Sequence, residues 1–107
     1  MYVIVWEFQA KPGAEEEFER VYGSAGEWAQ LFTRGEGYLG TELHREADGK
    51  ARYLVIDRWG SETAFLAFRE RWASEYEALD RRCELLTDRE TPIGSFVRLG
   101  SYQEREA

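Results

Sequence analysis

The sequence predicts an α+β fold of the ferredoxin-like type, in which the order β-α-β-β-α-β forms an antiparallel four-stranded sheet with both helices on one face. Three observations support this prediction. Strand-like and helix-like runs alternate in that order. Asp48-Gly49 is a strong hairpin signal between the second and third strands, because its turn needs positive φ at both central positions. A long amphipathic stretch follows the third strand and must lie on a sheet. The chain of 107 residues makes one domain, expected over residues 1–100, with a polar tail at 101–107.

Four segments have the composition of strands. Residues 2–9 are apolar at even and odd positions over most of their length, so we expect both faces to be covered. Residues 38–45 alternate, which places the even-numbered residues on one face and the odd-numbered ones on the other. Residues 53–59 are β-branched and aromatic, and residues 93–99 form the last strand. Pro92 precedes that strand and marks its start or a sheet edge, because proline has no N–H to donate.

The helical segments show periodic apolar residues. Residues 14–22 predict a short helix, and Ser24 to Glu27 has the spacing of a capping box, which predicts the start of a second piece. Ser61 can cap the next helix, and Glu62 adds negative charge at its positive end. Gaps of three and four then keep one face apolar, which predicts a single long helix through Phe65, Phe68, Trp72, Tyr76, Leu79, Cys83 and Leu86.

Composition excludes several functions. The net charge of −7 repels phosphate backbones and anionic membranes, so we expect neither nucleic-acid nor membrane binding. The chain has no run of 18 apolar residues and no basic-then-apolar leader. Cys83, the single cysteine, cannot form an internal disulfide, which is typical of a cytoplasmic protein, and we interpret it as a small core residue.

The predicted layout leaves one sheet face without helices. The first strand is apolar on both faces, so the uncovered face needs a partner. A second copy of the chain, related by a two-fold axis, satisfies this need most simply. We therefore expect a homodimer.

His44 is the only histidine, and it has two interpretations. It is a candidate catalytic base or metal ligand on the second strand, or it is a polar residue near a strand end beside solvent. A metal site is not expected, because no second histidine or thiolate stands at ligand spacing.

The aromatic residues also have two interpretations, since a chain with four tryptophans can build either a pocket for a flat ligand or a core of large rings. The candidate pocket residues are Trp6, Trp28, Tyr53, Trp59, Phe68, Trp72 and Tyr76. Asp57 shares a strand face with Trp59, and a carboxylate there must be paired or functional. We favour a structural pairing, for which Arg69 is a candidate and Arg58 is on the wrong face.

Three groups of segments resemble the antibiotic biosynthesis monooxygenase (ABM) domain family. They are residues 3–8 with Lys11-Pro12-Gly13, residues 37–40, and residues 56–61 with Ala64-Phe65. The resemblance covers about residues 2–99 and implies a dimeric α/β barrel with a pocket between sheet and helices in each protomer. Family members include oxygenases of polycyclic aromatic phenols that use no metal or flavin, haem-degrading enzymes, and proteins of unknown role.

The resemblance also indicates which activity to expect. Haem-degrading members use an asparagine on the first strand and a histidine and a tryptophan on the second helix. This chain has no asparagine and no histidine in that helix, and Phe68 stands near the expected tryptophan. The cofactor-independent oxygenases of the family use an asparagine, a tryptophan and a tyrosine or arginine around the substrate, and this chain can supply all of these but the asparagine. The resemblance thus implies a cofactor-independent monooxygenase of a small aromatic or quinol-like compound. Within that hypothesis we take His44 as the first candidate base. The alternative is a non-catalytic dimeric protein that binds small molecules or acts in stress responses.

Overall fold

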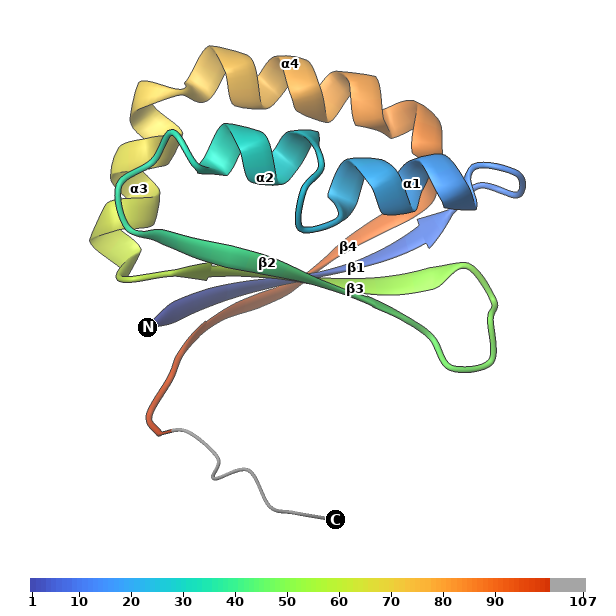
Figure 1. Cartoon of the computed structure of the whole chain (residues 1–107), viewed down its shortest axis with the longest axis horizontal. Coiled ribbons are helices and arrows are strands. Elements are labelled where there is room, and N and C mark those ends of the chain that lie inside the picture. Colours follow the sequence, from blue (N-terminus) through green and yellow to red (C-terminus); the bar gives the residue numbers. More distant parts are fainter. Residues whose placement is uncertain (101–107) are drawn as a thin grey trace.

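The computed structural model describes residues 1–100, in which four antiparallel strands form one sheet and the helices lie along one of its faces (Figure 1). The elements are β1 (Tyr2–Ala10), α1 (Glu15–Tyr22), α2 (Glu27–Phe32), β2 (Tyr38–Arg45), β3 (Arg52–Trp59), α3 (Glu62–Arg71), α4 (Ala73–Cys83), the 3-10 helix η1 (Glu84–Leu86) and β4 (Thr87–Val97). The sheet order is β2-β3-β1-β4, so the ferredoxin-like α+β prediction is confirmed. The predicted tail, residues 101–107, lies outside the described residues.

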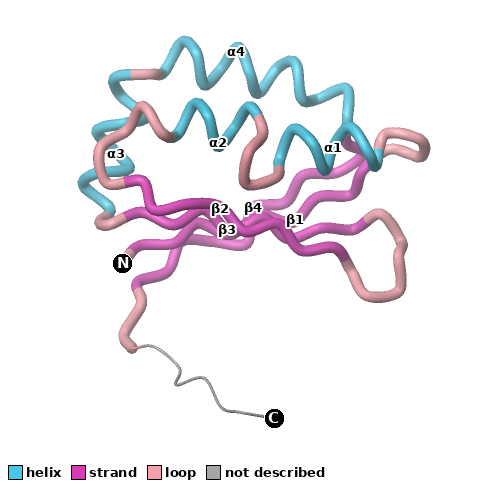
Figure 2. Tube along the Cα trace, viewed as in Figure 1, coloured by secondary structure: helices cyan, strands magenta, loops and turns pink. Residues whose placement is uncertain are grey.

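The two faces of the sheet have different surroundings (Figure 2). On the face toward the helices, Phe8, Tyr53 and Trp59 are buried, and their rings form the centre of the core. Val3 and Val5 point to the opposite face, which no helix of the described chain covers, and both remain partly exposed. Apolar residues thus occupy both faces of β1 as predicted, whereas helices cover only one of them.

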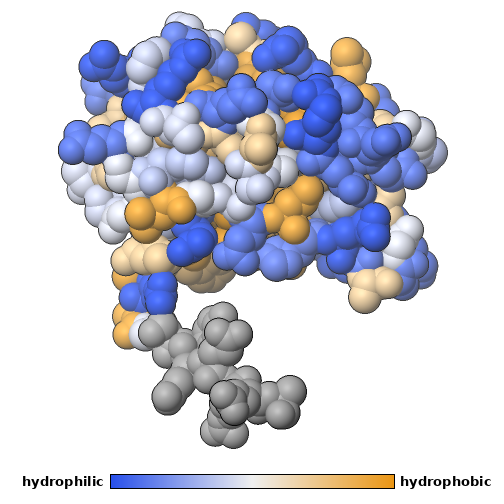
Figure 3. Space-filling model, viewed as in Figure 1, coloured by the Kyte–Doolittle hydropathy of each residue, from blue (hydrophilic) through white to orange (hydrophobic). Residues whose placement is uncertain are grey.

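The surface over the helices is largely hydrophilic, with separate hydrophobic patches at the level of the sheet (Figure 3). No helix of residues 1–100 has the length and apolar character needed to cross a bilayer.

The predicted long helix is interrupted at Trp72, which has φ −109° and ψ 26°. Hydrogen bonds from Trp72 N to Phe68 O and from Tyr76 N to Trp72 O, both 2.9 Å, continue the helical spacing across the break. The spacing of apolar residues therefore does not reveal the bend. The bend lets α3 pack on the Trp59 end of β3 while α4 runs alongside α2 (Figure 1).

The predicted capping box does not form. Helix α2 begins at Glu27 with Gly26 as its N-cap residue and without a side-chain cap, while Ser24 is exposed. A Cβ on Gly26 would lie 2.3 Å from two carbonyl oxygens of α1, so the close approach of the two helices requires glycine there. The carboxylate of Glu27 instead pairs with Arg20 at 2.7 Å.

Residues 46–51 connect β2 and β3, so the predicted hairpin is confirmed but its two-residue turn is wrong. Gly49 has φ +75° and Ala51 has φ +58°, whereas Asp48 is not among the residues with positive φ. The loop is closed by Glu46 N donating to Arg52 O at 2.8 Å.

The predicted alternation on β2 is wrong at its start. The register against β3 shifts between Tyr38 and Gly40, which leaves Leu39 as an extra residue in a β-bulge. Gly40 has φ +129°, a conformation that glycine adopts readily. The bulge places Tyr38 on the same face as Thr41, rather than on the opposite one.

The last strand begins earlier than predicted, at Thr87 rather than Ile93, and β4 is a sheet edge. Pro92 lies inside it, opposite Trp6, where the register against β1 shifts. An edge strand tolerates proline, because the missing N–H has no strand to bond on that side. The edge prediction for Pro92 is confirmed and the strand-start prediction is wrong.

Candidate functional site

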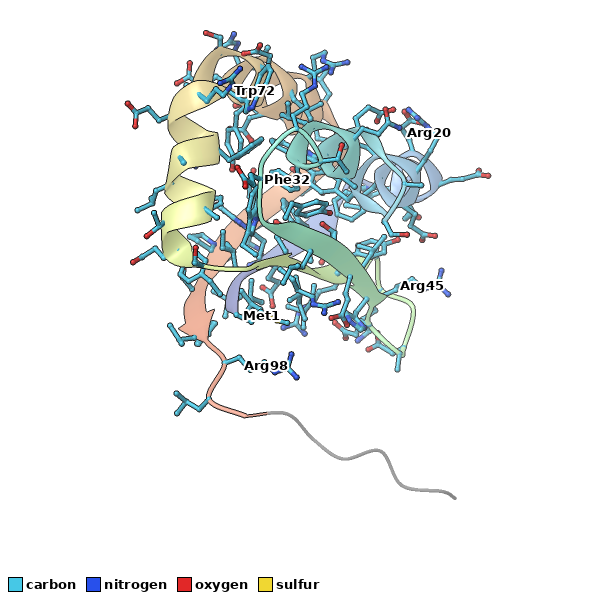
Figure 4. The ribbon with its side chains drawn as sticks, turned by 60° about the vertical axis from the view of Figure 1, so that its left-hand side comes forward. Met1, Arg20, Phe32, Arg45, Trp72 and Arg98 are labelled. Carbon is cyan, nitrogen blue, oxygen red and sulfur yellow. The ribbon has the colours of Figure 1, made fainter. Side chains whose placement is uncertain are left out.

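A cleft lies between the helix-facing side of the sheet and helices α2, α3 and α4. It consists of an inner chamber of about 30 Å³ and an outer chamber of about 210 Å³, which share Trp6, Phe32, Asp57 and Tyr76 as lining residues. Figure 4 shows Phe32 in the interior, between the helices and the sheet. A cavity of about 150 Å³ holds benzene in another protein, so the outer chamber has room for a small aromatic ring.

The cleft is mainly aromatic and contains few polar groups, which is typical of small-molecule sites. The outer chamber reaches the edge strand at Pro92 and Gly94. The polar side chains that line one chamber or both are Tyr22, Thr41, Asp57, Arg69, Tyr76, Glu90 and Ser95.

Asp57 is the buried carboxylate of this cleft. It projects from β3, opposite Ile4 of β1 and Thr41 of β2, and only 6% of its surface is exposed. The Thr41 hydroxyl donates to its Oδ1 at 2.8 Å. Burial raises the pKa of Asp57 to about 6, because desolvation disfavours the charged carboxylate, and the Thr41 hydrogen bond offsets part of that rise.

No salt bridge among residues 1–100 includes Asp57. The predicted arginine partner is therefore wrong, and a neutral hydroxyl stands in that place. A carboxylate without a neutralising cation, with its pKa raised toward neutrality, is suited to accept a proton at physiological pH.

Arg69 and Tyr76 border the outer chamber. The guanidinium carbon of Arg69 lies 3.9 Å from the centre of the Tyr76 ring, a cation–π contact. Burial raises the pKa of Tyr76, so its phenol stays protonated at neutral pH. Glu90 lines the inner chamber from β4, and burial raises its pKa as well.

The structure brings three of the predicted pocket residues together. Trp6 and Tyr76 line both chambers, and Trp28 lines the inner one. The rings of Trp28 and Tyr76 meet edge to face, with centroids 4.9 Å apart. These residues come from β1, α2 and α4, so the cleft depends on how the helices cover the sheet.

Three other predicted pocket residues belong to the packed core. Trp59 is fully buried and packs against Phe68, with ring centroids 5.2 Å apart. Tyr53 is also buried, but it lies away from the cleft and donates to Glu19 Oε2 at 2.6 Å. Trp72 lies at the junction of α3 and α4 (Figure 4), where it lines a separate open groove.

His44 lies outside the cleft. It is exposed on the sheet face that no helix covers, and its Nε2 is 3.1 Å from Oε1 of Glu42. No group of histidine, cysteine and carboxylate side chains within residues 1–100 is arranged to hold a metal ion.

From the sequence, Asp57 is either paired or functional and pairing is the favoured interpretation, while Thr41 is not a candidate at all. The available signal was a carboxylate inside a strand of aromatic and β-branched residues. Its interpretation depended on whether an arginine reached it, which the sequence does not show.

Solved structures with the same fold cover nearly the whole chain. A variant of SnoaB, a cofactor-independent oxygenase from Streptomyces nogalater, is 26% identical, with a TM-score of 0.74 over 96% of this chain and 97% of that one. A variant of MhuD, with two manganese protoporphyrin IX molecules per active site, is 23% identical, with a TM-score of 0.73 over 97% and 100%. A Pseudomonas aeruginosa protein is 19% identical, with a TM-score of 0.65 over 92% and 94%.

No sequence among the curated proteins matches the chain significantly. The family described as antibiotic biosynthesis monooxygenase matches residues 1–79, which is most of the chain. Together with the fold and the aromatic cleft, this match shows that the chain belongs to the antibiotic biosynthesis monooxygenase family.

Proposed function

We propose that the protein is a cofactor-independent monooxygenase that oxidises a small aromatic, quinol-like compound in the cleft. The observation that carries this proposal is the buried Asp57 carboxylate, which lines an aromatic cavity and forms no salt bridge with any cation of residues 1–100. The likeness to SnoaB supports it, because that protein is described as a cofactor-independent oxygenase.

The proposed reaction begins with proton transfer to Asp57 from an acidic C–H or phenol of the bound substrate. The resulting anion transfers one electron to O₂, and recombination of the radical pair forms a C–O bond and a peroxide. The proton on Asp57 then passes to the peroxide.

Asp57 next removes the second hydrogen from the same carbon as a proton. The C–H electron pair forms a carbonyl, the O–O bond breaks, and the departing hydroxide takes a proton to become water. For a methylene substrate the balance is R₂CH₂ + O₂ → R₂C=O + H₂O. Trp6 and Tyr76 provide flat surfaces for the ring, and Arg69 provides positive charge near the developing anion.

Haem chemistry does not fit these residues. The described cleft offers no imidazole and no thiolate as an axial ligand, because His44 is on the other side of the sheet and Cys83 does not line either chamber. The chambers are also below the roughly 300–1,000 Å³ that is usual for larger ligands.

We further propose a homodimer formed through the uncovered sheet face. Its apolar centre includes Val5, Leu54 and Phe96, of which Leu54 is 40% and Phe96 49% exposed. Arg52 pairs with Glu7 on the same face, so the patch carries both signs of charge beside an apolar centre. A patch with an apolar centre and both signs of charge can pair with its own copy across a two-fold axis, and this supports the proposed dimer. We also propose a cytoplasmic location, since Cys83 is a free, buried thiol.

Oxygen consumption tests the proposed activity. Anthrone and substituted hydroquinones would be supplied to the wild type, to Asp57→Asn and to His44→Ala. We expect uptake above the no-enzyme rate, a loss of at least about 100-fold in Asp57→Asn, and full activity in His44→Ala, because removing a general base typically costs 10²–10⁴-fold.

The same experiment addresses the alternative, a non-catalytic binding protein. Quenching of tryptophan fluorescence by these compounds without any oxygen uptake would favour binding alone. The close packing around Trp59 and Phe68 is the observation that supports that alternative.

A further inference from the structure

Three polar side chains form a hydrogen-bonded chain from β2 to the cleft. Oγ1 of Thr41 lies 2.8 Å from Oδ1 of Asp57, and the hydroxyl of Tyr38 lies 2.5 Å from Oγ1 of Thr41. A threonine hydroxyl has one proton to donate. Since a carboxylate only accepts, that proton goes to Asp57, and the Tyr38 phenol must donate to Thr41.

The hydrogen bond from Thr41 occupies only one carboxylate oxygen of Asp57, Oδ1. Oδ2 has no hydrogen-bond partner among residues 1–100, and part of its surface remains accessible to solvent. Asp57 lines both chambers of the cleft. Oδ2 is therefore the oxygen available to a bound molecule.

The β-bulge at Leu39 makes this arrangement possible. In a regular strand, residues three apart point to opposite faces, so Tyr38 could not reach Thr41. The extra residue, with Gly40 at φ +129°, turns Tyr38 to the helix-facing side. There its ring packs against Trp59, with centroids 5.3 Å apart, which fixes the phenol near Thr41. Burial raises the pKa of Tyr38, which keeps the phenol a donor.

We infer that Thr41 and Tyr38 are positioning residues for Asp57: they hold Oδ1 as a permanent acceptor and thereby reserve Oδ2 for the proton that moves to and from the substrate. This inference rests on the proposed function. When Asp57 is protonated, Oδ1 still accepts from Thr41 as a carbonyl oxygen, so the proton resides on Oδ2, facing the cleft. The carboxylic acid is then oriented to return its proton to the peroxide.

Other groups near Asp57 do not provide this orientation. Tyr76 and Arg69 from the helices, and Glu90 from β4, line the same cleft, but none makes a hydrogen bond or salt bridge to Asp57 in the described chain. Thr41 is the only side chain of residues 1–100 that does so. The orientation of Asp57 therefore depends on Thr41, and that of Thr41 on Tyr38.

The first arm of the test needs no activity. The Asp57 side-chain carboxyl would be titrated by ¹³C NMR in the wild type, Thr41→Val, Thr41→Ser and Tyr38→Phe, with Asp57→Asn to assign the signal. Losing a hydrogen bond to a charged group should raise the pKa of Asp57 in Thr41→Val by about one unit or more. We expect a smaller rise in Tyr38→Phe and the wild-type value in Thr41→Ser. An unchanged pKa of Asp57 in Thr41→Val would overturn the inference. If Thr41→Val does not fold, an unchanged pKa of Asp57 in Tyr38→Phe would overturn it instead.

The second arm separates positioning from a simple change in acidity. At pH 9 Asp57 is deprotonated in every variant, so an effect on acidity alone would disappear. We expect kcat for oxygen uptake in Thr41→Val to stay at least tenfold below wild type at pH 9, with KM nearly unchanged and with rescue in Thr41→Ser. Recovery of kcat at pH 9 would overturn positioning. Absence of uptake in the wild type would instead refute the proposed function. The titration would then still test whether Thr41 and Tyr38 orient Asp57, because it does not depend on activity.

Discussion

His44 and Asp57 lie on opposite faces of the same sheet. In the β2–β3 register His44 pairs with Leu54 and Thr41 pairs with Asp57, and Leu54 and Asp57 are three residues apart on β3. The side chains of residues separated by an odd number of positions point to opposite faces. Of the two candidate bases, only Asp57 therefore reaches the cleft.

This relationship predicts that His44→Ala is nearly silent. The side chain is half exposed, and its contact with Glu42 is a surface pair that contributes little to stability. We expect the free energy of unfolding in urea to change by less than about 0.5 kcal/mol. Loss of oxygen uptake in this variant, with folding intact, would contradict the placement of the site.

Asp57 should make the protein less stable at high pH. Its pKa is raised from 3.8 to about 6 in the folded state, so the folded state binds the proton more tightly than the unfolded one. The contribution of Asp57 to the free energy of unfolding should therefore fall as the pH rises from about 4 to 6, by an amount on the order of 3 kcal/mol.

Asp57→Asn should remove that dependence. The variant should be more stable than wild type at pH 8, and the two should converge near pH 4, as measured by urea unfolding at both values. A variant that is less stable than wild type at pH 8 would show that the carboxylate stabilises the fold.

A side chain at Gly35 should destabilise the fold, because the core leaves no space for it. A Cβ there would lie 2.9 Å from Trp59 Cη2 and 2.9 Å from Phe68 Cδ1, and both rings are held in the core. We expect Gly35→Ala to lower the free energy of unfolding by about 1–3 kcal/mol. Gly60→Ala is the matched control, because its nearest contact would be 3.5 Å. Equal thermal midpoints for the two variants would argue against this packing.

The uncovered sheet face should determine the oligomeric state. Ile56 lies on this face of β3, and a lysine there would place a charge inside the proposed interface. We expect Ile56→Lys to sediment as a monomer. Leu66→Lys, on the outer side of α3 where the leucine is 55% exposed, should sediment like wild type. A wild-type monomer at micromolar concentration would refute the dimer.

The order of strands and helices along the chain was predictable from the sequence, because period-2 alternation, helical spacing and turn residues are local signals. The bend at Trp72 was not, since helical hydrogen bonds continue through it and the apolar spacing is unbroken. The bulge at Leu39 was hidden for a similar reason: one extra residue reverses the alternation without changing the composition.

The site was predictable only in part. Trp6, Trp28 and Tyr76 were recognisable as large rings, but which rings border a cavity depends on how α2 and α4 cross the sheet. Trp59 and Phe68 have the same chemistry and fill the core instead. The role of Asp57 depends on a missing arginine and a nearby hydroxyl, and both are properties of the folded chain.

The pH dependence of oxygen uptake tests the role of Asp57 most directly. With a substrate that does not titrate between pH 4 and 9, kcat/KM should rise about tenfold per pH unit below a midpoint near 6 and then level off. The rise of kcat/KM with pH should persist in His44→Ala, and it should be absent from the residual activity of Asp57→Asn. A profile that persists in Asp57→Asn and vanishes in His44→Ala would contradict the assignment of the base.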